Sequence, residues 1–168
     1  MLSHYISTLD QGVSFLTQLQ QRDYCKLADG LPSSIGDHVR HILDHFMSLQ
    51  NCLETGIVDY ENRRRGSLVE TSLPEALNQF NNIKQWMLAL TEADISQVVR
   101  VHSDVGINQT HIIEVESTLA RELMFACSHA IHHYSTLKLI FQLIGGKTHA
   151  EFGLAPSTAS FNRKHCAQ

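Results

Sequence analysis

Features that would point to a membrane, a nucleic acid or an extracellular setting are missing from the sequence. No apolar run approaches the roughly 20 residues that a helix needs to cross a bilayer. The chain has 13 lysines and arginines against 17 aspartates and glutamates, whereas nucleic-acid-binding domains usually carry a basic surplus. The amino terminus lacks the basic and apolar regions of a signal peptide, and the four cysteines form no CxxC pair. We therefore expect a cytoplasmic protein with reduced thiols that binds neither membrane nor nucleic acid.

The composition that remains is that of one folded domain. A length of 168 residues with 43% apolar and 18% charged residues is enough to bury a core. We predict a single domain over residues 1–168, in which residues from about 148 to 168 form a docked or loose C-terminal tail. The one basic run, Arg63–Arg65, lacks interleaved aromatic residues, so we interpret it as a solvated loop.

Apolar residues recur at intervals of three and four in four stretches, which is the pattern of amphipathic helices. We predict these helices from Ser3 to about Cys25, from Ser33 or Ser34 to about Glu54, from Ser72 to about Leu90 and from Ser117 or Thr118 to Gly145. The long stretch 55–71 indicates a crossover between non-neighbouring helices. Alternating β-branched residues at 98–104 and 110–116 predict a hairpin. The predicted fold class is all-α, a four-helix bundle with a long crossover connection and a small β-hairpin before the fourth helix.

Histidine is abundant, and its placement suggests a metal site. The sequence has 11 histidines. His129 and His133 are four residues apart, so they share one helix face, the spacing by which a helix gives two imidazoles to one ion. At about 100° per residue, His38, His41 and His45 lie along one edge of the apolar stripe of the second predicted helix. The alternative is that all these residues are surface or interface histidines. Imidazole ligands would favour Zn, Ni, Fe or Cu over Ca or Mg.

The chain resembles the DinB-like superfamily of metal-binding four-helix bundles over nearly its whole length. The resemblance rests on the segment from Ser33 to His41 and on the His129–Tyr134 segment, with Arg121-Glu122 before it and 152–158 after it. It implies one divalent transition metal, Zn, Ni or Fe. The implied ligands are His41, His129 and His133, and the competing choices are His38 and His45.

The resemblance also implies a function. Members of the superfamily include metal-dependent transferases and isomerases that use low-molecular-weight thiols, so we expect a metal-dependent transferase or hydrolase with a small-molecule thiol substrate, assembled as a homodimer. Glu122 and His132 are the candidate acid–base groups, and Asp37 is a candidate for orienting the His41 ring. The alternative is a non-catalytic metal-binding or stress-response protein in which the ion holds two helices together.

Overall fold

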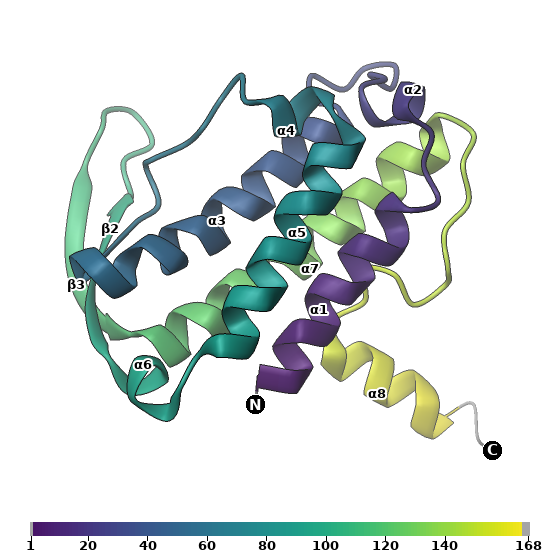
Figure 1. The fold of residues 1–168 in the computed structure, drawn as a ribbon. Coiled ribbons are helices and arrows are strands. Elements are labelled where there is room, and N and C mark those ends of the chain that lie inside the picture. Colours follow the sequence, from purple (N-terminus) through teal and green to yellow (C-terminus); the bar gives the residue numbers. More distant parts are fainter. Residues whose placement is uncertain (1, 166–168) are drawn as a thin grey trace.

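The computed structural model describes residues 2–165 and is mainly helical, with a three-stranded sheet at one end (Figure 1). The four long helices are α1 (Leu2–Leu16), α3 (Ile35–Thr55), α5 (Leu73–Ala89) and α7 (Leu119–Leu143). Both α1 and α3 pack against α5 and α7. The prediction of a mainly helical chain with a small sheet is confirmed.

The two helices that carry the histidine pattern begin at the residues expected from their caps. Ser34 and Asp37 form a reciprocal capping box, because the Ser34 amide donates to Asp37 Oδ2 at 2.7 Å and the Asp37 amide donates to Ser34 Oγ at 3.2 Å. At α7, the Arg121 amide donates to Thr118 Oγ1 at 3.3 Å. Oδ2 of Asp37 is therefore engaged at the cap, and within residues 2–165 no hydrogen bond joins Asp37 to the His41 ring. The orienting role expected for Asp37 stays a prediction.

The first predicted helix is shorter than expected. α1 ends at Leu16, and a separate short helix, α2 (Gln21–Tyr24), follows. The Tyr24 side chain is buried, and its hydroxyl donates to the Val69 carbonyl at 2.5 Å. This contact joins α2 to the connection before α5, while Leu19 in the break still reaches the core. Apolar periodicity therefore continued through a stretch that is not helical.

The sheet combines the predicted hairpin with one unpredicted strand. β2 (Val98–Asp104) pairs antiparallel with β3 (Ile112–Thr118), which confirms the hairpin. β1 (Ile57–Asp59), within the long connection, pairs parallel with β2. The connection also holds α4 (Leu68–Thr71), and the short α6 (Glu92–Ser96) precedes β2. Because α3 and α5 contact each other, the expectation that this connection joins non-neighbouring helices is wrong.

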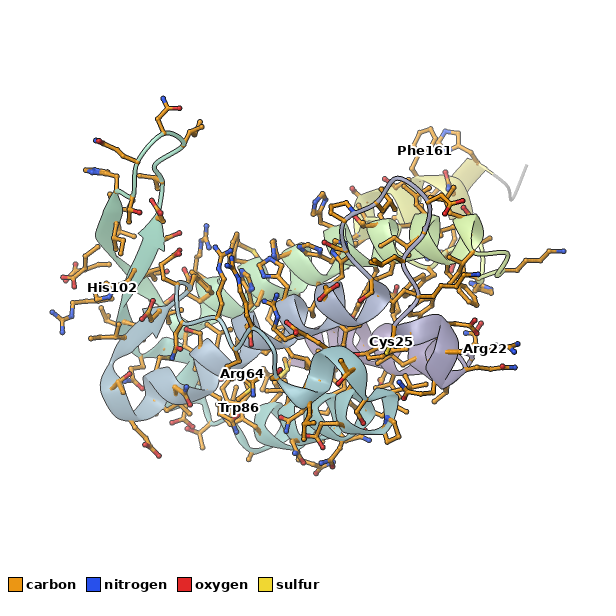
Figure 2. The ribbon with its side chains drawn as sticks, turned by 90° about the horizontal axis from the view of Figure 1, so that it is seen from above. Arg22, Cys25, Arg64, Trp86, His102 and Phe161 are labelled. Carbon is orange, nitrogen blue, oxygen red and sulfur yellow. The ribbon has the colours of Figure 1, made fainter. Side chains whose placement is uncertain are left out.

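Buried ion pairs fasten the long connection to α3. Arg64 Nε donates to Asp44 Oδ1 at 3.1 Å, and Arg40 pairs with Asp44 at 3.0 Å and with Glu70 at 2.8 Å. Only 5% of the Asp44 side chain is exposed. The interpretation of the basic run as a solvated loop is therefore wrong at its middle residue; Figure 2 labels Arg64 beside the helices. This network holds the segment that follows β1 in place.

Two features of the described residues concern the expected setting of the protein, namely its helix hydrophobicity and its cysteines. Within residues 2–165, no helix combines the length and the apolar character needed to span a membrane. Cys25, Cys52 and Cys127 are free thiols, as expected, and Cys166 lies outside the described residues.

The C-terminal segment docks through one aromatic residue. Phe152 stacks on Phe15 with ring centroids 4.6 Å apart and on Tyr134 at 5.2 Å. Beyond it, α8 (Pro156–His165) was not predicted and has no buried residue. Phe161 on α8 projects outward in Figure 2. The docked tail is thus held mainly by Phe152.

Replacing Phe152 by alanine is expected to lower the free energy of unfolding by about 3 kcal/mol, because it removes a buried aromatic ring and leaves a cavity. Phe161→Ala is the matched control, since 59% of that residue is exposed, and it should change stability by less than about 0.5 kcal/mol. Urea unfolding of the metal-free protein measures both. Equal effects of the two substitutions would contradict the docking role of Phe152.

Candidate metal centre

Five histidines from α3 and α7 gather in one cluster between these two packed helices. They are His38, His41, His45, His129 and His133. His132 is exposed, and its ring centroid lies 5.4 Å from that of His133 and 6.4 Å from that of His129. The hairpin histidine His102 instead pairs with Glu114 at 2.6 Å and is labelled on the sheet in Figure 2. The structure therefore brings together all the ligand candidates named from the sequence.

Two close contacts meet at one nitrogen of His129. His129 Nε2 lies 3.0 Å from His41 Nε2 and 3.1 Å from His133 Nε2. An imidazole nitrogen has a single in-plane position, either one N–H or one lone pair, so His129 Nε2 cannot form good hydrogen bonds with both neighbours. Two nitrogens bound to one ion at about 2.1 Å would lie roughly 3.0–3.4 Å apart. The spacing of these nitrogens therefore fits a shared cation better than a hydrogen-bond chain.

The two remaining histidines flank this point. His38 Nδ1 lies 3.0 Å from His133 Nδ1, which places His38 behind the His133 ring on the side away from His129. His45 is buried, and its Nδ1 donates to the His41 carbonyl at 3.0 Å, which leaves its Nε2 with the lone pair. Ligand-capable atoms of His41, His45 and His129 all lie within 4.8 Å of one another. His45 is therefore close enough to be a further donor.

The cluster is electrically suited to stay neutral. Desolvation, together with the charges of neighbouring imidazoles, lowers the pKa of His41 and of His129 to about 3. Desolvation, followed by the charge of His38, lowers the pKa of His133 to about 4. Burial also lowers the pKa values of His38 and His45. At neutral pH all five rings therefore carry lone pairs, which is the protonation state that binds metal.

This donor set fits a divalent transition metal. The converging atoms are imidazole nitrogens, which suit Zn, Ni, Fe and Cu, whereas Ca and Mg prefer oxygen ligands. His41, His45 and His129 can offer three nitrogens that all lie within 4.8 Å of one another, and His133 Nε2 lies 3.1 Å from His129 Nε2. Three protein ligands would leave a position for water or another ligand. The residues of the cluster could therefore hold a divalent transition metal.

Aromatic residues cover one side of the cluster. The Tyr60 ring stacks on the His45 ring with centroids 4.9 Å apart, and His45 stacks on His129 at 4.2 Å. Phe125 lies 5.4 Å from Tyr60 and 5.8 Å from His129. The carboxylate of Glu122 is buried and bonds the Tyr60 hydroxyl at 2.6 Å. The acid–base roles expected for Glu122 and His132 stay predictions.

Comparison with known proteins gives the fold. No protein-family model matches the chain. A crystal structure of a DinB-like protein, YjoA of Bacillus subtilis, matches with a TM-score of 0.60 over 90% of this chain and 94% of that chain, at 20% sequence identity. The chain has the DinB-like fold. A curated protein, FK506-binding protein 5 of Rhizopus delemar, is 26% identical over 108 residues, which are 64% of this chain and 28% of that protein.

Within this DinB-like fold, the sequence pattern predicted the clustered histidines but not the aromatic residues beside them. His129 and His133 were visible as an HxxxH pair, and the second histidine helix as an edge of an apolar stripe. Tyr60 follows a three-residue strand in a connection without periodicity, so no local signal placed it beside His45. Phe125 belonged to α7, but only the packing of α3 and α7 shows that it borders the cluster.

Proposed function

We propose that the chain is a divalent-metal-binding protein whose ion is held by Nε2 of His41, His129 and His133, in a centre open enough for chemistry on a small molecule. The observation that supports this proposal most directly is the pair of 3.0 and 3.1 Å contacts on one nitrogen of His129. Zn, Ni or Fe suits the donor set. A homodimer and a small thiol substrate remain part of the proposal.

The residues around the ligands would each have a defined task. His38 faces Nδ1 of His133, where a hydrogen bond fixes the tautomer and the ring orientation. Burial keeps the ligand imidazoles neutral and available at neutral pH. A bound divalent ion would supply Lewis acidity, lowering the pKa of a coordinated water or thiol to give a nucleophile at neutral pH. His132, exposed beside His133, is the nearest described histidine for proton transfer at the cluster rim.

One observation favours a second function, a structural metal site without turnover. His45 lies close enough to His41 and His129 to act as a fourth ligand, and four protein ligands around zinc are typical of closed structural sites. In that arrangement the ion would join α3 to α7 and leave no position for a substrate. The number of open positions therefore separates the two functions.

Binding of an external ligand to the cobalt-loaded protein tests the open centre. Co(II) replaces zinc with a visible spectrum, and we expect azide or a small thiol such as 2-mercaptoethanol to shift that spectrum saturably. An unchanged spectrum at millimolar ligand would favour the closed structural site. As a second measurement, consumption of a small thiol with an electrophilic acceptor should depend on metal. Equal rates for metal-free and metal-loaded protein would reject the enzymatic function.

A further inference from the structure

Glu122 is buried next to Tyr60, and both of its carboxylate oxygens accept hydrogen bonds. Only 3% of the residue is exposed. Oε2 accepts the Tyr60 hydroxyl at 2.6 Å, and Oε1 accepts the Ser117 hydroxyl at 2.6 Å and Arg121 Nη1 at 3.3 Å. A carboxylate removed from water is stable only when such donors replace its hydration. Its partners come from three parts of the chain, so Glu122 joins α7 to β3 and to the segment after β1.

Tyr60 carries this connection to the histidines. Its hydroxyl is held by Glu122, and its backbone amide donates to the His102 carbonyl at 3.1 Å, so both ends of the residue are fixed. Between them, the ring lies against His45 with an interplanar angle of 29°, and His45 lies against His129 with an angle of 28°. Three rings are thus stacked in a row, and the outermost is anchored to a buried carboxylate.

His45 has little freedom in this stack. Its Nδ1 donates to the His41 carbonyl, and its ring stacks against both the Tyr60 ring and the His129 ring. A shift of the Tyr60 ring would therefore be transmitted to His45, and through it to the ring of His129, whose Nε2 meets both His41 and His133. Mutation of outer partners that hydrogen-bond metal-binding residues typically costs about 10–100-fold in metal affinity, and we take this as the scale expected here.

We propose that Glu122 and Tyr60 form a positioning pair for the metal centre: the carboxylate fixes the Tyr60 hydroxyl, and the Tyr60 ring sets the orientation of His45 and His129. The inference rests on the proposed metal site. It gives Glu122 a role that acts through Tyr60 and requires no direct contact with the ion or a substrate.

The experiment compares Co(II) binding by wild type, Tyr60→Phe, Glu122→Ala and Glu122→Gln. Tyr60→Phe keeps the ring and removes the hydroxyl anchor, and we expect at least a tenfold weaker affinity together with a changed Co(II) visible spectrum. Glu122→Ala should do the same. Glu122→Gln retains an oxygen that accepts the Tyr60 hydroxyl, so it should recover most of the wild-type spectrum.

Tyr24→Phe is the matched control, because it also removes a buried tyrosine hydroxyl bond, to the Val69 carbonyl, in another part of the fold. This substitution should leave the Co(II) spectrum unchanged even where it lowers the free energy of unfolding. A wild-type spectrum and affinity in Tyr60→Phe would overturn the positioning role while the metal site stands. Equal weakening by Tyr24→Phe and Tyr60→Phe would also overturn it. Failure of the wild type to bind Co(II) would remove the proposed function and this inference together.

Discussion

Replacing His129 by alanine is expected to abolish stoichiometric metal binding. Its Nε2 lies within 3.1 Å of both other proposed ligand nitrogens, so its loss removes the donor shared by both close contacts. Loss of an outer partner already costs about 10–100-fold in affinity, and loss of a direct ligand should cost at least the upper end of that range. Metal content of untagged protein, followed by competition with a chromogenic chelator, measures the change.

The control for this prediction is His111→Ala, which removes an exposed imidazole near the hairpin turn. It should bind one ion per chain as the wild type does. Single alanine substitutions at His41 and His133 should resemble His129→Ala. Full metal content in His133→Ala would contradict the proposed ligand set. If His45→Ala also loses the metal, the alternative set of His41, His45 and His129 would take its place.

The metal-free protein is expected to lose stability steeply on mild acidification. The folded-state pKa values of His41 and His129 are about 3 and that of His133 is about 4, whereas an unfolded histidine titrates near 6.5. Between these values the unfolded chain binds more protons than the folded chain, so the free energy of unfolding falls as the pH drops from about 6.5 toward 4. Above about 6.5 these histidines should contribute no pH dependence.

Urea unfolding in the presence of a chelator, at intervals from pH 7.5 to 4.5, measures this loss. Carboxylates titrate in the same range, so the informative comparison is with His129→Gln, which lacks one buried imidazole. The variant should show a shallower dependence on pH than the wild type. Parallel curves would show that the His129 imidazole protonates in the folded protein as readily as in the unfolded one.

In the folded protein, acid should weaken metal binding only at a pH lower than the unperturbed histidine pKa suggests. From the unperturbed histidine pKa alone, affinity would be expected to fall below about pH 6.5. Burial lowers the ligand pKa values to about 3 and 4, so proton competition in the folded state begins nearer pH 4. Between these limits, loss of bound metal should follow unfolding of the chain, which far-ultraviolet circular dichroism recorded on the same samples will show.

The helices and the histidine faces could be predicted because their signals are local. The HxxxH pair on α7 and the caps at Ser34 and Thr118 depend on residues within one or two turns of each other. The break after Leu16 could not be predicted, because the contact of Tyr24 with Val69 joins residues 45 positions apart. Tyr60 was missed for the same reason, since its partner Glu122 lies 62 positions away.

The internal arrangement of the histidine cluster was also beyond the sequence. His38, His41 and His45 share an edge of α3, and periodicity alone ranks them equally. Only side-chain geometry shows that His41 Nε2 contacts His129 Nε2 and that His38 contacts Nδ1 of His133. The same holds for the bond from His45 Nδ1 to a backbone carbonyl. These differences arise from the packing of α3 on α7, which no short segment encodes.

The separation of His41 from His129 by 88 positions has a thermodynamic consequence. An unfolded chain presents only scattered imidazoles, so the complete ligand set exists only after α3 and α7 have docked. A cation that binds this set selects the native state, and at 100 times its dissociation constant it would add about 2.7 kcal/mol to the free energy of unfolding. The folded fraction of this protein would then rise and fall with the supply of free metal.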